Sequence, residues 1–395
     1  MAFSASRDVP SLVTNQGTIL MSQSQRVSLR QCFSKLTDPR RRKVVYPLIN
    51  VVTIAICAVL CGADDFVSIA EFGRAKRKWL SRFLDLSAGI PSHDRFNAIL
   101  GALNVEEFQK CLLELITTLH EVTEGQVVAI DGKTLRRSFD RASGKSAIHM
   151  VSAWASANHI TLGQMVVEEK SNEITAIPKL LKILELSGCL VTIDAMGCQV
   201  EIARAIVEAK ADYVLAVKDN QPTLARGIDA FFAEHVEDDF ARVDARQCVT
   251  EAKGHGRQER REHVVCRVPD NLPDGHRWPK LAAIGMVFTC VLRDGKECTE
   301  CRHYILSKYL SAKKFAQAVR DHWSIENRLH WQLDVTFQED QCRIRKGNAD
   351  ANFSSLRRTA LSLLKNNHSK KVGVKNKRLL AALDDDYLLE VLLGQ

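Results

Sequence analysis

Between residues 126 and 218, apolar runs of strand length alternate with amphipathic runs of helix length, and this order restricts the possible folds more than any other feature of the sequence. Runs rich in aliphatic and β-branched residues predict five strands, at 126–131, 147–157, 160–168, 189–195 and 212–218. Two runs with helical periodicity lie between the later strands, at 175–187 and 199–209. The predicted order is therefore β-β-β-α-β-α-β.

This order is that of an α/β protein with an RNase H-like core, a mixed five-stranded sheet with helices. Right-handed crossovers place the strand at 189–195 beside and parallel to the strand at 126–131. Asp131 and Asp194 lie at the C-terminal ends of these strands, so we expect both carboxylates at one sheet edge, where α/β proteins bind ligands. Adjacent like charges repel unless a cation holds them, and Mg²⁺ or Mn²⁺ prefers oxygen ligands. The alternative is that each aspartate caps the turn that follows it.

The regions around this core differ from it in character. Residues 24–122 predict a small all-α domain, whereas residues 1–23 are polar, lack the pattern of an export signal and are expected to be disordered. The core domain is expected at 123–340, with a β-rich insertion at about 245–310. The rest, 341–395, predicts a basic helical segment.

One long helix is expected at about 311–333, and it carries three chemically active side chains. His322, Glu326 and His330 follow one another at intervals of four residues and therefore share a face. They could form a zinc site, or Glu326 could be the third carboxylate beside the two aspartates. Trp323 and Ile325 are expected to pack the helix on the sheet.

Positive charge is concentrated near the C-terminus. The chain has a net charge of +8, and residues 341–380 contain 11 Lys and Arg against the single acid Asp350. Such a segment favours a polyanionic partner, although a solvated basic tail would have the same composition. The 12 cysteines lack paired zinc-site spacing and are interpreted as reduced thiols of a cytoplasmic protein. The uncharged run at 44–63 contains Pro47 and Asn50 and predicts a buried helix better than a membrane span.

Several segments together resemble one known family. They are KLTDPRRRKVVYPL, AIDGKTLRRS, EKSNEITAIPKLLKILELSGCLVTIDAMGCQ, DYVLAVKDNQ, HGRQERR and HWSIENRLHWQLDVTFQED, and they extend from about residue 30 to residue 365. The chain resembles insertion-sequence transposases of the Asp-Asp-Glu (DDE) class, in particular the H-repeat-associated, ISAs-type branch.

The resemblance implies a transposase that binds the ends of an insertion sequence and catalyses DNA cleavage and strand transfer. It implies a catalytic triad of Asp131, Asp194 and Glu326, which would hold two Mg²⁺ or Mn²⁺ ions. The partners would be double-stranded DNA, at the terminal inverted repeats and the target, and further copies of the chain in a homodimer or higher oligomer. It implies a bacterial protein that acts in the cytoplasm at the nucleoid. Related transposases carry Tyr, Arg and Lys around the glutamate, where this chain has Val319, His322 and Leu333.

Basic and amide side chains near the predicted sheet edge are candidates for DNA contacts. The third strand is expected to run parallel to the first, so its end lies at the same edge, as does the KDNQ segment after the fifth strand. Glu173 and Asp219 are interpreted as acids that cap helices. The predicted DNA-binding residues are Lys133, Arg136, Arg137, Lys170, Asn172, Lys218, Asn220, Gln221, His322, Arg343, Arg345 and Lys346, and the basic segment adds Arg357 and Arg358.

Three other functions are compatible with parts of the sequence. The first is a catalytically inactive, transposase-derived DNA-binding protein. The second is a metal-dependent nuclease or phosphatase that does not transpose DNA, although the basic segment favours a long duplex partner. The third is a basic domain with structural zinc.

Overall fold

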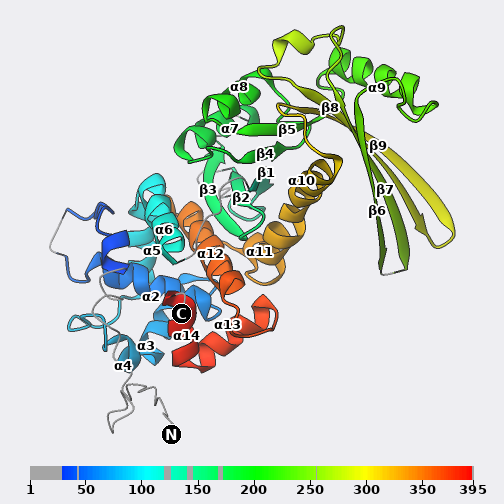
Figure 1. The fold of residues 1–395 in the computed structure, drawn as a ribbon. Helices are drawn as coiled ribbons and strands as arrows, with labels where there is room; N and C mark the ends of the chain where they lie inside the picture. Colours follow the sequence, from blue (N-terminus) through cyan, green and yellow to red (C-terminus); the bar gives the residue numbers. More distant parts are fainter. Residues whose placement is uncertain are drawn as a thin grey trace, which may run out of the picture.

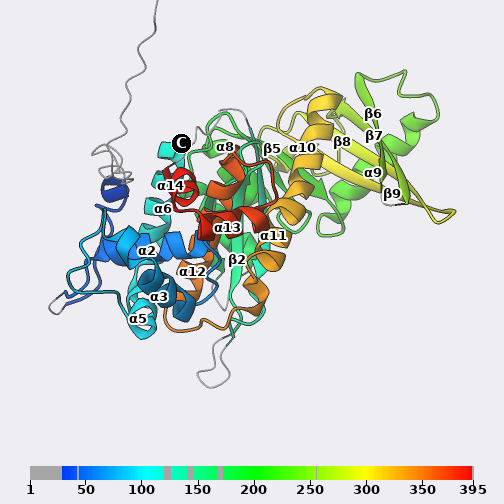
Figure 2. The same cartoon turned by 90° about the horizontal axis from the view of Figure 1, so that it is seen from below.

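The structure is a computed structural model, and it describes residues 29–41, 44–119, 126–139, 146–167, 172–254 and 256–393. The predictions for residues 1–23 and for Lys170 lie outside these ranges. Figure 1 shows three neighbouring parts: a helical lobe, a central sheet with helices on it, and an arm of long strands. The helical segment α10–α11 runs from the arm past the sheet towards the lobe (Figure 1, Figure 2).

One mixed sheet of nine strands forms the centre of the molecule, in the order β3-β2-β1-β4-β5-β9-β8-β7-β6. Its first five strands in chain order lie where the sequence predicted them: β1 (Val127–Thr134), β2 (His149–Ala155), β3 (Ile160–Val167), β4 (Leu190–Ile193) and β5 (Asp212–Val217). Strand β4 is parallel to β1 and β5 is parallel to β4, whereas β2 is antiparallel to β1 and to β3. The predicted parallel pairing of the first and fourth strands is confirmed.

The sheet was expected to contain five strands, and it contains nine. Four long antiparallel strands extend it: β6 (Ala245–Gly254), β7 (Arg257–Arg267), β8 (Ala283–Arg293) and β9 (Lys296–Leu306). Strand β9 pairs with β5, from Val214 with Leu306 to Val217 with His303. This pairing satisfies backbone groups that β5 would otherwise leave open at a sheet edge. The strands that we predicted as an insertion therefore continue the central sheet.

Helices cover both faces of β1–β5 (Figure 1). Val128 and Ile130 point to the face covered by α7 and α8, whereas Ala129 packs with Ile325 and Leu329 on the other face. A π turn, Glu326–His330, interrupts the helix that was expected at about 311–333. The helices on the sheet and the arm are α7 (Glu173–Ile183), α8 (Val200–Glu208), α9 (Pro222–Val236), α10 (Ala312–Ile325) and α11 (Trp331–Val335).

The first and last helices of the described chain form one hydrophobic core, which occupies the helical lobe (Figure 2). They are α2 (Leu48–Leu60), α3 (Phe66–Ala75), α4 (Arg77–Leu80), α5 (His93–Ala102), α6 (Val105–Leu119), α12 (Ala349–Asn366), α13 (Val374–Leu383) and α14 (Asp385–Leu393). Helix α2 is buried from Asn50 to Leu60, which confirms the prediction of a core helix for this uncharged run. Among the described helices, none combines the length and the hydropathy that a membrane crossing requires.

Candidate active site

The ends of β1 and β4 bring Asp131 and Asp194 together. The last register pair between these strands is Ile130 with Ile193, so the two aspartates follow it side by side, and neighbouring strands lie about 4.8 Å apart. Burial raises the pKa of Asp194, and the negative charges of Asp131 and Glu173 add to this effect. A hydrogen bond from the backbone N–H of Gly197 opposes it only in part. The two predicted carboxylates therefore share one sheet edge and repel each other.

Glu326 joins them from the π turn that follows α10. A π turn is wider than an α-helical turn, and it directs both Glu326 and His330 towards Asp131. Burial raises the pKa of Glu326, and the positive charge of His330 lowers it. The negative charge of Asp131 and a hydrogen bond between the Glu326 and Asp131 carboxyl groups raise the pKa further, so the net shift is upward. Asp131 on β1 is thus approached by Asp194, which directly follows β4, and by Glu326 from the π turn.

Two histidines lie beneath these acids. His330 Nε2 is 3.1 Å from Asp131 Oδ2, and His322 Nδ1 is 3.1 Å from the hydroxyl oxygen of Thr192 on β4. Burial would raise the pKa of Asp131, but the hydrogen bond and charge of His330, together with the charge of His322, hold it below its ordinary value. Burial lowers the pKa of His322, which is 9% exposed. His322 therefore faces the carboxylates from inside and is poorly placed for the DNA contact that we predicted.

The other acids near Glu326 are already paired with cations. Lys133, two residues after Asp131 on β1, contacts Asp334 and lies 3.3 Å from Glu339. Glu339 is 1% exposed and also accepts hydrogen bonds from Arg358 (2.9 Å) and Ser354 (2.8 Å). Although burial opposes it, the charges of Arg358 and Lys133 lower the pKa of Glu339 to about 2. The Lys133 ammonium is occupied by these acids, which argues against the phosphate contact predicted for it.

Asp131, Asp194 and Glu326 are the acids of this edge that could hold a divalent cation. Neither Asp194 nor Glu326 has an ion pair with a described Lys or Arg, and hard oxygen ligands are those that Mg²⁺ and Mn²⁺ prefer. As the side chains lie, the described residues contain no group of three that could hold a metal ion. The carboxyl group of Asp131 is engaged by His330 and Glu326. Binding of a cation would replace the bond between Asp131 and Glu326.

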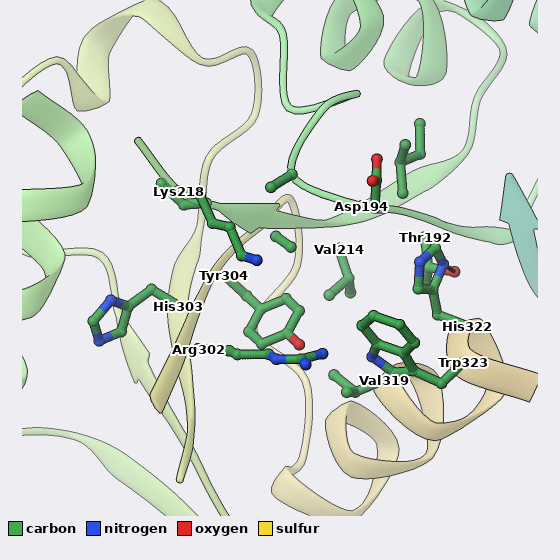
Figure 3. Close-up of a pocket in the computed structure, with 14 residues that line it drawn as sticks. Thr192, Asp194, Val214, Lys218, Arg302, His303, Tyr304, Val319, His322 and Trp323 are labelled. Carbon is green, nitrogen blue, oxygen red and sulfur yellow. Dashed lines mark hydrogen bonds between the residues drawn. The ribbon is translucent and has the colours of Figure 1, made fainter. Parts of the chain in front are cut away.

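A cavity of about 90 Å³ lies beside Asp194 (Figure 3). Its lining includes Asp194, Lys218, Arg302 and Trp323, from four different elements. The Arg302 guanidinium lies 4.5 Å from the centre of the Trp323 ring and also binds Glu300 through two hydrogen bonds. Trp323 is 43% exposed here and does not pack on the sheet as predicted, whereas Ile325 is buried as expected. Sequence reasoning missed Arg302, because the pairing that brings its strand beside β5 has no local signal.

Several predicted DNA-binding residues instead support the loops of this edge. Asn172 caps α7 by accepting a hydrogen bond from the Thr175 backbone N–H, and Glu173 lies in the first turn of that helix, as expected. Asn220 and Gln221 donate to the carbonyl oxygens of the loop after Asp194. The residue that caps the start of α9 is Gln221 and not Asp219.

The remaining predicted cations divide into exposed and buried groups. Arg136 is 80% exposed in its side chain and lies 3.3 Å from Asp340, while Arg345 donates to the carbonyl oxygen of Arg137. Arg343 and Lys346 are also exposed. In contrast, Arg357 and Arg358 are 1% and 2% exposed, so the prediction that they contact phosphates is wrong. Arg358 binds Glu339, and Arg357 donates to the carbonyl oxygen of Asp64.

Comparison with known proteins identifies the family. The family model described as a transposase DDE domain matches residues 123–363, and a second model, of the DDE_Tnp_1-associated family, matches residues 30–116. The chain belongs to the DDE transposase family. A family member from Escherichia coli O157:H7, "Putative transposase YncI", is 42% identical over 370 residues, which cover 92% of this chain and 94% of the relative. "H repeat-associated putative transposase YhhI" of Escherichia coli K12 is 39% identical over 372 residues, covering 93% and 98%. A third relative, "Inactive transposase YbfQ" of the same strain, is 38% identical over only 52 residues.

Proposed function

We propose that the chain binds the ends of an insertion sequence and catalyses metal-dependent DNA cleavage and strand transfer. The observation that carries this proposal is the approach of Asp194 and Glu326 to Asp131, in which both have raised pKa values and neither forms an ion pair with a described Lys or Arg. The nearby ammonium group of Lys133 pairs with Asp334 and Glu339. Acids that repel one another and that the charges of His322, His330 and Lys133 offset only in part, in a member of this family, suit a cation supplied from outside.

In this proposal Asp131, Asp194 and Glu326 hold two Mg²⁺ or Mn²⁺ ions. Bound together, two such ions activate a water or a DNA hydroxyl group and stabilise the leaving oxygen. His330 orients Asp131 by a hydrogen bond to its Oδ2. Asn220 and Gln221 hold the loop that carries Asp194. The chain's own residues thus fix the positions of the ligands before any cation arrives.

The accessible cations near this edge would contact the DNA backbone. Arg136, Arg137, Arg343 and Lys346 are exposed and Arg345 is half-buried; they come from the segments that follow β1 and α11, which the hydrogen bond from Arg345 to Arg137 joins. Lys218 is exposed at the neighbouring cavity. Phosphate contacts of this kind position a duplex without reading its sequence.

We further propose a division of labour along the chain. The helices before residue 123 would recognise the transposon end, and the domain at 123–340 would carry out the chemistry. The basic helical segment at 341–395 would add backbone contacts, while its helices share a core with the N-terminal ones. Two transposon ends and a target must meet in strand transfer, so we propose that the chain acts as a dimer or higher oligomer on DNA at the bacterial nucleoid.

The alternative is a DNA-binding protein that has lost catalysis. The observation that favours it is the short match to a relative named as an inactive transposase. The three acids present here weigh against it, because a purely DNA-binding protein has no use for them.

A cleavage assay on a duplex that carries the element's own ends tests the proposal. Wild-type protein with Mg²⁺ should nick the ends and join them to target DNA. Asp131→Asn and Asp194→Asn should abolish both reactions and leave DNA binding intact. Binding without cleavage in the wild-type protein would establish the inactive alternative, and the absence of binding would refute the proposal.

A further inference from the structure

A group of basic side chains lies on the flank of the α10–α11 segment that points away from the carboxylates. Arg328 is two residues from both Glu326 and His330, so it points to the opposite side of the helical segment. Lys365 and His368 come from the end of α12 and the loop after it, and His159 comes from the turn between β2 and β3. We call Arg328, Lys365, His368 and His159 the flank patch.

Contacts between three elements hold the flank patch together. Asn366 donates a hydrogen bond of 2.7 Å to the carbonyl oxygen of Asn158, which joins the end of α12 to the β2–β3 turn. The same turn is joined to α10 by the Ser156 hydroxyl, which donates to the carbonyl oxygen of Asp321 at 3.2 Å. Trp154 lies under the patch: its ring stacks on His159 with centroids 5.9 Å apart, and Lys365 Nζ is also 5.9 Å from its centre.

Few acidic side chains lie near the basic side chains of the flank patch. After burial, the groups that act on His159 are Lys365, Arg328 and His368, and they lower its pKa to about 4. The pKa of Lys365 falls to about 8, mainly through burial and also through Arg328 and Lys377. Asp321 is the acid that faces Arg328, and it is partly buried. His159 Nδ1 and Trp154 Nε1 are buried without a hydrogen-bond partner among the described residues.

Four other cations of the basic segment at 341–380 are held inside the protein. Arg358 and Arg378 bind the acids Glu339 and Asp64, while Arg357 and Lys377 donate to backbone carbonyl oxygens. These groups are not available to a partner. Arg328 is exposed and Lys365 is half-buried, and no described acid forms an ion pair with either.

We infer that the flank patch binds the phosphate backbone of duplex DNA at a site separate from the catalytic edge. The inference rests on the proposed function, which supplies the polyanion. Strand β2 ends beside Val128, three residues before Asp131, so the β2–β3 turn with His159 lies about 10 Å or more from Asp131, at about 3.3 Å per residue. Arg328 is nearer to Glu326 in the chain but points to the opposite side of the segment. A duplex has a phosphate about every 3.4 Å along each strand, so the patch would hold phosphates several nucleotides from the one that is cleaved.

The salt dependence of DNA binding tests this inference. Affinity for a duplex with the transposon end is measured over a range of KCl concentrations without divalent cations, so that the carboxylate site is not involved. Arg328→Gln with Lys365→Gln should lower the slope of log K against log salt by about 1.8, because each phosphate contact contributes about 0.9. The matched control is Lys313→Gln with Lys314→Gln, which removes the same charge from the exposed start of α10 and should leave the slope unchanged.

A charge-conserving pair, Arg328→Lys with Lys365→Arg, should bind DNA as the wild-type protein does, and each single Gln variant should lose about half of the slope change. If the thermal transition of the double Gln variant shows that it does not fold, the single Gln variants and the charge-conserving pair test the inference in its place. An unchanged slope in the Gln variants, or an equal loss in the control pair, overturns the inference while the proposed function stands. Failure of the wild-type protein to bind any duplex refutes the proposed function itself.

Discussion

Two groups of acids gather around β1, one at Asp131 and one at Lys133, and the protein treats them in opposite ways. At the edge of β1 and β4, Asp194 and Glu326 lie close to Asp131, and no described Lys or Arg forms an ion pair with these acids. Two residues further along β1, Lys133 contacts Glu339 and Asp334, and Arg358 from α12 completes the second group. The first group raises the pKa of Asp194 and Glu326, whereas the second lowers that of Glu339 to about 2.

The opposite pKa shifts of the two groups show two different roles for acids in this protein. An acid whose charge is balanced inside the protein contributes to the stability of the fold, since it is better placed there than in the unfolded chain. Acids that repel one another weaken the fold, and groups with such perturbed pKa values are concentrated at functional sites. Asp131 and Lys133 are two residues apart and point to the same face of β1, so one strand takes part in both arrangements.

The largest expected effect is on DNA cleavage, which should depend on the first group of acids and not on the acids outside it. Glu326→Gln should reduce Mg²⁺-dependent cleavage to background, a loss of several orders of magnitude, because enzymes exceed uncatalysed rates by about 10⁶-fold or more. Asp340→Asn should spare cleavage, because Asp340 pairs with Arg136 and does not face Asp131. Gel-resolved cleavage of an end-labelled duplex measures both variants. The reverse outcome would move the third carboxylate from the π turn to the segment after α11.

The second effect concerns stability. Glu339→Gln should lower the free energy of unfolding by about 3–5 kcal/mol, because it leaves the charge of Arg358 buried without an acid and leaves Lys133 with Asp334 alone. Denaturant unfolding followed by circular dichroism measures the change. The matched control is Asp340→Asn, whose partially exposed pair with Arg136 should change stability by about 1 kcal/mol at most. A loss as small as that of the control would mean that the buried group does not stabilise the fold.

Acid pH provides an independent check on Glu339. The ordinary pKa of the group is 4.5 and that in the folded protein is about 2. A group with a lowered pKa stabilises the fold above its unfolded value and loses this contribution as the pH falls through its folded value. The wild-type protein should therefore lose this stability between about pH 4.5 and pH 2, and the decrease should be smaller in Glu339→Gln.

The smallest expected effect is the response of stability to cations. Mg²⁺ at about ten times its dissociation constant should raise the free energy of unfolding by about 1.4 kcal/mol, because it binds only the folded carboxylate group. Asp194→Asn should lose this increase, and Glu339→Gln should keep it at its own lower baseline. Thermal unfolding with and without Mg²⁺ measures the increase. An equal increase in Asp194→Asn would place the cation elsewhere in the molecule.

The parts of the fold and site that the sequence predicted are those encoded by a local pattern of residues. The apolar runs at 126–131 and 189–195 marked β1 and β4, and the handedness of their connection was enough to place Asp131 beside Asp194. The pairing of β9 with β5 was missed, because residues 90 positions apart carry no shared periodicity. The extra strands therefore appeared as an insertion and not as part of the central sheet.

The charge of a sequence segment was the least reliable predictor of DNA contacts. Arg357 and Arg358 contribute the same charge to the basic segment as Arg343 and Lys346, yet the first two are buried and the others are exposed. Arg358 and Arg357 can be buried because they bond to Glu339 and to the carbonyl group of Asp64, and these partners are close to them only in the folded protein. The exposure of Trp323 was missed for a similar reason: helical periodicity assigned it to the core, and Arg302 from β9 holds it at a cavity.

The core shared by the first and last helices has a consequence for synthesis on the ribosome. Helix α2 is one of the most apolar segments of the chain, and α12, which covers it, begins almost 300 residues later. At about 5–20 residues per second, α2 waits roughly 15–60 s before its partner is translated. During that interval α3 can pack on α2, but the face that α12 covers stays exposed, and a chain that stops before residue 349 leaves that face uncovered. The last part of the chain to be translated thus completes the core of the first.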